Sequence, residues 1–405
     1  MLKSVGAGVA ATALAGCLGG DDDDENVIHY GAVSPLSGAY GWMGGEERKG
    51  LDLRVAQINE SDDILPDHEI EVTWVDSETD PDTGLAAARE LVDREGIDIL
   101  GGAVSSGVAA ALSSYAANED LIYLLHSATD RALTTGEDCQ RVTFRNHMHT
   151  EQQSGPCGWW AGENLGDTAY VLYQDYSYGH ASRDSAIDYF EQLGGEVLET
   201  TGLPLGHEDF ASVLDDIISL DPDWLFMGMS AEGAAFFPQA VERGLEVPMI
   251  CQWLPSDESG VLTEEIIDQL PPVYTNSVFS EHIDTPENQA YIEAFQDEYG
   301  ESPTATSTMT YRIGTFLGQV LDQTDGSTDA DAFIEAAEND GEGTRYQGPQ
   351  HEVHVRACDH QAVARSQIEQ LVGVDTDAER GLYEYIEEVD LSEYIPDCDD
   401  VECEF

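Results

Sequence analysis

Short apolar runs alternate with amphipathic segments along the chain from residue 27 onward. The runs VIHYGAV, EIEVTWVD, IDILGG and LIYLLHS are typical of strands, and the segments between them have the periodicity of helices: ERKGLDLRVAQINE, DTGLAAARELVDREG and SGVAAALSSYAANED. The alternation restarts at AYVLYQD and continues to VPMICQW. Because βαβ order produces a parallel sheet covered on both faces, the two series predict an α/β protein with two doubly wound, Rossmann-like lobes.

The segment after VPMICQW has a mixed pattern. VYTNSVFS indicates a strand, NQAYIEAFQDEYG and TSTMTYRIGTFLGQVLDQT indicate helices, and EVHVRACDHQAVARSQIEQLV indicates a terminal pair of strands. About 390 mature residues with 41% hydrophobic content provide enough apolar surface for two cores, so we do not expect disorder.

The N-terminal 26 residues differ from the rest. Lys3 precedes an apolar stretch, residues 4–16, that is too short to span a membrane but typical of a secretory signal. Residues 14–17, LAGC, resemble the lipobox of bacterial and archaeal lipoproteins. We therefore expect a signal peptide over residues 1–16, lipidation of Cys17, and an acidic tether over residues 17–26 that holds the protein at the outer face of the cell membrane. An ordinary signal peptide, with Cys17 incidental, is the alternative.

The charge is strongly acidic, with 81 Asp and Glu against 16 Lys and Arg and a formal net charge of -65. Such a surface repels itself in dilute buffer, whereas molar salt shortens the screening length to about 3 Å. We interpret this composition as adaptation to high salt. A calcium array is the alternative, but the chain has no D-x-[DN]-x-[DN]-G loop. Nucleic acid is excluded as a partner because no basic face is available to bind phosphates.

Six cysteines remain when Cys17 is set aside. Their full pairing could follow any of fifteen connectivities, and the sequence does not separate them. For Cys358 we expect a structural disulfide. The other five are Cys139, Cys157, Cys251, Cys398 and Cys403.

Small hydroxyl residues follow two of the predicted strands. Ser105 and Ser106 come after IDILGG, and Ser127 and Thr129 come after LIYLLH. In open parallel sheets, ligands bind beyond the carboxyl ends of the strands, where helix N-termini also point. Each serine could instead be a helix cap. Two such pairs at strand ends nevertheless favour a site for a carboxylate or carbonyl group.

Six segments, in this order and spacing, resemble the leucine/isoleucine/valine-binding branch of the type I periplasmic binding proteins: AVSPLSGAYGWMGGEERKGLDLRVAQINE, VDSETDPDTGLAAARELVDREGIDILGGAVSSGVAAAL, HSATDRALT, TFRNHMHTEQQSG, YQDYSYGHASRDSAIDYFEQLGGEV and DFASVLDDIISLDPDWLFMGMSAEGAAFFPQAVERGL. The resemblance implies two lobes joined by three crossovers that close on a small ligand and present it to an ABC permease and its ATPase. It places lobe one at about 27–147 plus 277–352 and lobe two at 148–276 plus 353–405.

The resemblance also implies which residues contact the ligand. Ser105 matches the family serine that binds the ligand carboxylate, and residues 127–129 match positions that receive the carboxylate and the ammonium. Tyr178 matches the lobe-two aromatic that closes over the ligand. The ligand-binding residues that we expect are Ser37, Tyr40, Ser105, Ser106, Ser127, Ala128, Thr129, Tyr178, Ser230 and Trp253.

One departure from the family pattern affects the expected ligand. Amino-acid-binding members place an acidic residue after the strand VPMICQ, and this chain has Trp253 there. A buried ammonium without a carboxylate partner is costly. Either Asp175, Asp257 or Glu258 supplies the carboxylate, or the ligand is not an α-amino acid. We expect a branched-chain or related amino acid, with amide, urea and aromatic-acid ligands as alternatives.

Enzyme and metal motifs are weak in this chain. GMSAEG does not match G-x-S-x-G, so Ser230 is a poor nucleophile. His147 and His149 in NHMHT could begin a metal site but have no third ligand at recognisable spacing, so we expect a crossover segment with solvated histidines. We predict a monomeric binding protein with no cofactor or metal and no catalytic activity. A transport receptor is favoured over a ligand sensor because no transmembrane or catalytic segment follows CDDVECEF.

Overall fold

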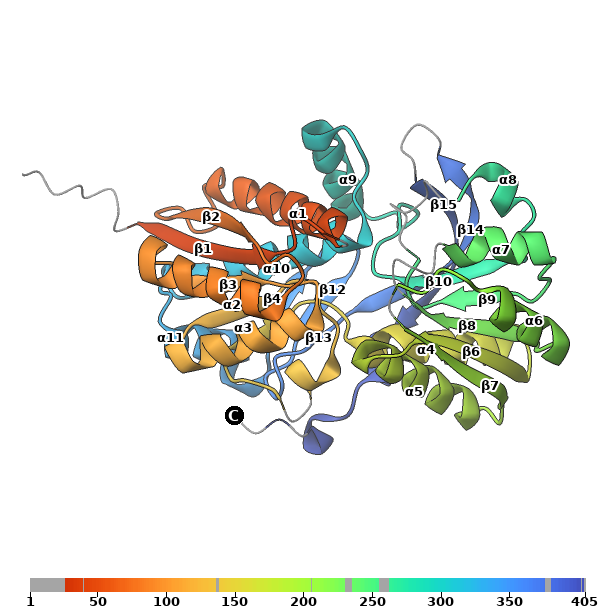
Figure 1. Ribbon diagram of the computed structural model, residues 1–405. Helices are drawn as coiled ribbons and strands as arrows, with labels where there is room; N and C mark the ends of the chain where they lie inside the picture. Colours follow the sequence, from red (N-terminus) through yellow and green to blue (C-terminus); the bar gives the residue numbers. More distant parts are fainter. Residues whose placement is uncertain are drawn as a thin grey trace, which may run out of the picture.

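The computed structural model describes residues 26–38, 40–135, 138–204, 206–229, 235–254, 262–375, 380–401 and 403. These residues form two α/β lobes side by side, with the chain passing between them more than once (Figure 1). The predicted signal peptide, Cys17, the acidic tether and Ser230 lie outside the described residues. The predicted fold class is confirmed.

Lobe one contains a five-stranded parallel sheet of order β2-β1-β3-β4-β5. β3 and β4 are buried at every position, as expected for strands covered on both faces. The strands are β1 Val27–Ser34, β2 Glu69–Asp76, β3 Ile99–Gly102, β4 Ile122–Leu125 and β5 Thr143–Arg145. The helices are α1 Gly41–Asn59, α2 Pro81–Glu90, α3 Ser106–Glu119, α9 Pro286–Tyr299, α10 Ala305–Gln323 and α11 Ala330–Glu338.

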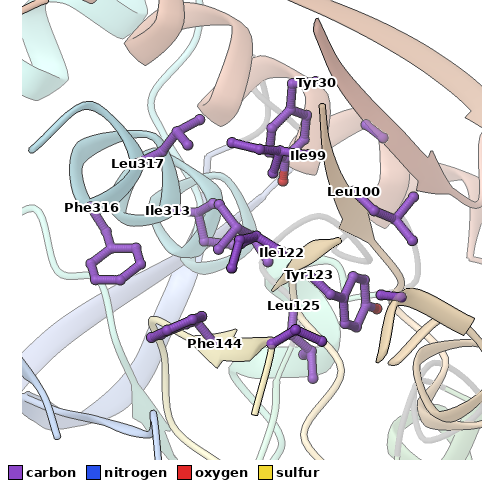
Figure 2. Close-up of a cluster of buried hydrophobic side chains, with 14 of the residues drawn as sticks. Tyr30, Ile99, Leu100, Ile122, Tyr123, Leu125, Phe144, Ile313, Phe316 and Leu317 are labelled. Atoms are coloured by element: carbon purple, nitrogen blue, oxygen red, sulfur yellow. The ribbon is translucent and has the colours of Figure 1, made fainter. Parts of the chain in front are cut away.

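The core of lobe one joins this sheet to α10, although the two are far apart in sequence. Figure 2 shows Ile313, Phe316 and Leu317 of α10 in the same apolar cluster as Ile99 and Ile122 of the central strands. α10 begins at a capping box, in which the Thr304 side chain accepts a hydrogen bond from the Ser307 backbone N–H. The long helix that the sequence predicts here therefore completes the first lobe.

Lobe two contains a seven-stranded sheet of order β15-β14-β10-β9-β8-β6-β7. β14 pairs antiparallel with both β10 and β15, and the remaining pairs are parallel. The strands are β6 Thr168–Gln174, β7 Glu196–Leu203, β8 Trp224–Gly228, β9 Met249–Cys251, β10 Val273–Ser277, β14 Arg365–Asp375 and β15 Arg380–Asp390. The helices are α4 Thr150–Asn164, α5 Ser177–Gln192, α6 Ala211–Leu220, α7 Phe236–Arg243 and α8 Glu264–Ile267.

The third passage between the lobes lies later in the chain than the sequence predicts. β11 Thr344–Gln347, β12 Glu352–Val355 and β13 Ala362–Val363 form a small antiparallel sheet. Val353, Val355 and Ala362 of this sheet belong to the lobe-one core. Residues 353–363, which were expected in lobe two, therefore pack in lobe one, and the chain enters the large sheet of lobe two only at β14.

Two disulfides hold the C-terminal segment. Cys358 is bonded to Cys398, which confirms the disulfide expected for Cys358. Cys139 is bonded to Cys403, so the end of the chain returns to lobe one after β15. Cys157 and Cys251 are free and buried.

His147 and His149 are buried at 1% and 0% exposure, so the expectation of solvated histidines is wrong. The His149 Nδ1 atom accepts hydrogen bonds from the backbone N–H groups of Glu151 and Gln152 at the start of α4. Burial lowers the pKa of both imidazoles well below the ordinary value. Among the described residues, no group of three His, Cys, Asp or Glu could hold a metal ion, and no helix is long and apolar enough to cross a membrane.

Candidate functional site

A cavity of about 370 Å³ lies between the two lobes. The cavity is larger than an isolated water site and within the range that small organic ligands occupy. Lobe one contributes Tyr40, Trp42, Met43, Thr79, Val104, Ser105, Ser106, Gly107, Ser127, Thr129 and Met309, and lobe two contributes Gln153, Tyr176, Ser177, Tyr178 and Trp253.

The lobe-one hydroxyl groups lie at the carboxyl ends of β3 and β4. Ser105 precedes α3 with an extended backbone, but its side chain makes no capping hydrogen bond. The alternative that Ser105 is simply a helix cap is therefore not supported. Residues 127 and 128 both donate backbone N–H groups to the Ala103 carbonyl, at 3.2 and 3.1 Å. These bonds hold the two strand-end loops together, so the serines converge at one edge of the sheet.

Ser127 is oriented by a buried carboxylate. Its hydroxyl donates to the Glu47 carboxylate, which also accepts from the Ser34 hydroxyl at 2.5 Å. His126 Nδ1 lies 3.4 Å from Glu47 Oε2, and His126 Nε2 lies 2.9 Å from the Tyr30 hydroxyl. Because the Ser127 proton is committed to Glu47, its oxygen is left to accept a hydrogen bond from a ligand.

Glu47 was not among the site residues expected from the sequence, although the pattern of α1 contains a signal for it. Gly44, Glu47, Leu51, Val55 and Ile58 are all buried along α1, at the three- and four-residue spacing of one helix face. An acidic residue on this apolar stripe indicates a buried charge with specific partners.

Lobe two closes the cavity with aromatic side chains. Tyr178 is partly buried, its hydroxyl is hydrogen-bonded to Gln252, and burial raises the pKa of its phenol. The rings of Tyr176 and Tyr178 stack with centroids 5.8 Å apart. Trp253 follows β9, and with Tyr40 and Trp42 it gives the cavity five aromatic residues.

Seven of the ten predicted ligand-binding residues line this cavity. They are Tyr40, Ser105, Ser106, Ser127, Thr129, Tyr178 and Trp253. Ser37 does not, because its exposed hydroxyl donates to Asp76 Oδ2 at 2.6 Å. Ala128 is buried at 1% exposure and is not part of the lining. Ser230 lies outside the described residues.

The described lining of this cavity carries no formal charge. Asp175, one candidate partner for a ligand ammonium, is 60% exposed in its side chain and bonds His180 at 2.8 Å. Asp175 therefore does not supply a carboxylate to the cavity. Asp257 and Glu258 lie outside the described residues.

Comparisons with known proteins indicate the family of this chain. The sequence model of the periplasmic binding protein family matches residues 27–376. Leu/Ile/Val-binding protein homolog 6 from Brucella suis is 25% identical over 327 residues, which cover 77% of this chain and 80% of that protein. The chemotactic signal transduction system substrate-binding protein BasB from Halobacterium salinarum is 29% identical over 226 residues, which cover 53% of each chain.

Solved structures share the two-lobed fold. The amino acid ABC transporter substrate-binding protein from Pseudomonas fluorescens Pf-5 has a TM-score of 0.82 at 20% identity, covering 94% of this chain and 99% of that chain. A solute binding protein of an ABC transporter from Rhodopseudomonas palustris BisB5, in complex with 3,4-dihydroxy benzoic acid, has a TM-score of 0.77 at 22% identity, covering 92% and 99%. The family match spans most of this chain, which therefore belongs to the periplasmic binding proteins, a family of transport receptors and not of enzymes.

Proposed function

We propose that this protein is the extracytoplasmic solute-binding component of an ABC uptake transporter and that it captures one small organic ligand by closure of its lobes. The observation that carries the proposal is the cavity of about 370 Å³ lined by both lobes. A ligand that contacts both walls binds the closed arrangement more tightly than the open one, so it shifts the population toward closure. The closed receptor is then the form that a permease recognises.

A small aromatic carboxylic acid is the ligand class that the described lining supports best. Ser105, Ser106 and the N-terminal N–H groups of α3 provide neutral hydrogen-bond donors for a carboxylate. The five aromatic residues of the cavity provide faces and edges for a ring. The Ser127 oxygen can accept from a hydroxyl or N–H group elsewhere on the ligand. The solute binding protein from R. palustris that binds 3,4-dihydroxy benzoic acid shows that the fold accommodates such a ligand.

A branched-chain or related α-amino acid is the second candidate, as first expected from the sequence. The Leu/Ile/Val-binding homologue supports it. This ligand needs a carboxylate for its ammonium, and the described lining contains none. Asp257 and Glu258 are the acidic residues that would have to supply it. Short amides and urea carry no ammonium group and need no carboxylate partner, so they are further candidate ligands for the titration below.

Isothermal titration in molar sodium chloride separates these ligands. The panel is 4-hydroxybenzoate, benzoate, leucine, acetamide and urea, and we expect the hydroxybenzoate to bind most tightly. Replacing Ser105 and Thr129 together with alanine should weaken binding by about 2 to 4 kcal/mol, because a ligand carboxylate loses its buried donors. The control is Ser114→Ala, which removes an exposed hydroxyl from the same helix, α3. Leucine as the only binder would overturn the ligand class, and unchanged affinity in the double variant would overturn the site.

The alternative function is a ligand sensor that uses the same body. The similarity to BasB supports it, because that protein belongs to a chemotactic signal transduction system. Deleting the gene separates the two functions. Loss of growth on the ligand with normal swimming supports uptake, whereas loss of attraction to the ligand with normal uptake supports sensing.

We further propose that Cys17 carries a lipid anchor and that the acidic segment up to residue 26 is a hydrated tether. Durable attachment needs more than one lipid chain, because one chain alone binds a membrane only marginally. In the natural host, Cys17→Ser should move the protein from the membrane fraction into the medium. Retention of the variant in the membrane fraction would contradict the anchor.

A further inference from the structure

A second cavity, of about 330 Å³, shares Trp253 with the ligand cavity and is otherwise lined by different residues. Lobe one contributes residues 303–306 at the start of α10. Lobe two contributes residues of β10, β14 and β15, and the segment 279–282 after β10 completes the wall (Figure 1). An occupant of this cavity would therefore contact both lobes.

Glu369 of β14 supplies a buried carboxylate to this cavity. The residue is 4% exposed and lies opposite Thr275 of β10 in the antiparallel pair. The Ser280 hydroxyl donates a hydrogen bond to its carboxylate. Among the ion pairs of the described residues, none involves Glu369, although His282 lies close enough to favour its ionised form. A buried carboxylate in this situation has a strong preference for a positively charged partner.

Two further polar atoms in this lining have no hydrogen-bond partner. They are the Asn276 side-chain carbonyl oxygen and the Thr306 hydroxyl, each on a residue that is 1% exposed. Both oxygens can accept a hydrogen bond. Together with Glu369, they make the polar part of the lining rich in acceptors.

The apolar part of the lining is aromatic. Trp253, Phe279 and Tyr383 contribute their rings. Aromatic faces attract cations, and an aromatic wall beside a carboxylate is the combination that recognises organic ammonium groups. A divalent metal ion is a poorer match, because among the described residues no group of three His, Cys, Asp or Glu could hold one.

We propose that this second cavity binds a small organic ammonium ion, with the Glu369 carboxylate as its counter-charge and Trp253, Phe279 and Tyr383 as its walls. The proposal does not depend on which ligand occupies the first cavity. The ammonium ion would touch lobe one at the start of α10 and lobe two at β14, so its binding would favour the lobe arrangement that holds both walls in place.

Saturation-transfer NMR with n-butylammonium tests the proposal on the full mature protein in molar sodium chloride. The neutral probe n-butanol controls for apolar binding alone. We expect n-butylammonium to bind the wild type about tenfold more tightly than n-butanol, and Glu369→Gln to remove that preference. Glu387→Gln is the matched control, because it removes an exposed carboxylate of β15 that lies outside this lining and should retain the preference.

A pH series gives a second, independent readout. Burial raises the pKa of Glu369 to about 7, so n-butylammonium should bind more tightly at about pH 8.5 than at about pH 5.5, while the amine stays protonated. Glu281, His282 and Tyr383 also face the cavity. The pH dependence should therefore persist in Glu281→Gln and His282→Asn and disappear in Glu369→Gln.

Three results would overturn the proposal. The first is a wild type that binds n-butylammonium no better than n-butanol. The second is a folded Glu369→Gln variant, verified by its melting transition, that keeps the wild-type preference. The third is a pH dependence that survives in Glu369→Gln.

Discussion

Replacing Glu369 with glutamine should stabilise the protein above neutral pH and change its stability little in acid. The carboxyl group is 4% exposed, and burial raises its pKa from 4.5 to about 7. In the unfolded chain the group releases its proton near the ordinary value. Between these two pKa values the folded state binds more protons than the unfolded state, so the free energy of unfolding falls as the pH rises.

The size of this effect follows from the two pKa values. One pH unit corresponds to about 1.4 kcal/mol, so ionised Glu369 lowers the free energy of unfolding by about 3 kcal/mol at pH 8 relative to pH 4. Glutamine has the same shape and does not ionise. Its amide can still accept the hydrogen bond from Ser280, so the variant should regain most of that free energy above pH 7.

Urea unfolding in molar sodium chloride measures the difference. We expect the free energy of unfolding of Glu369→Gln to match that of the wild type within about 1 kcal/mol near pH 4.5 and to exceed it by up to about 3 kcal/mol near pH 8. Glu281→Gln makes the same change in net charge at an exposed position and should stay within about 0.5 kcal/mol at both pH values. Equal effects of Glu369→Gln at both pH values, or equal effects of the two variants, would show that ionisation of Glu369 does not destabilise the folded protein.

Three other substitutions test features that the site depends on. Glu47→Gln should weaken ligand binding and lower the free energy of unfolding by about 1 to 3 kcal/mol, measured by titration and urea unfolding, because Ser127 loses a charged acceptor. Cys358→Ser should lower the free energy of unfolding by about 2 to 4 kcal/mol, because it removes the disulfide to Cys398. Adding reductant should then lower the free energy of unfolding of the variant less than that of the wild type. His149→Ala should lower the free energy of unfolding, measured in urea, by about 1 kcal/mol, because α4 loses its N-terminal cap. An unchanged free energy of unfolding would contradict the capping role of His149.

The fold was predictable because the buried parallel strands are short apolar runs separated by helical patterns. β3 and β4 are examples, since burial on both faces leaves no polar alternation to confuse with other structure. The end of the chain was harder. β12 is four residues long and pairs with β11 in a hairpin. This pairing places β12 in lobe one, and the sequence EVHV alone does not indicate which strand it pairs with.

The lobe-one half of the candidate site was predictable for a related reason. Ser105 and Ser127 follow neighbouring parallel strands, and such strands end at one edge of the sheet. Ser37 does not line the cavity, because its hydroxyl donates a hydrogen bond to Asp76 at the end of β2, a partner 39 residues away in the sequence. Trp42 and Tyr176 were missed because their contribution depends on how the two lobes face each other.

The burial of Glu47 and Glu369 could not be predicted from the sequence. Ile368 and Glu369 are neighbours on β14, so their side chains point to opposite faces of the sheet. This pattern by itself predicts that Glu369 lies on a polar, solvated face. That face is buried because the start of α10 and residues 279–282 cover it. In a chain with 81 acidic residues, composition does not distinguish Glu47 and Glu369 from the rest. Burial distinguishes these two residues, because only a carboxylate removed from water must have a specific partner. Glu47 has serine hydroxyls as partners, and in our proposal Glu369 has a bound ammonium ion.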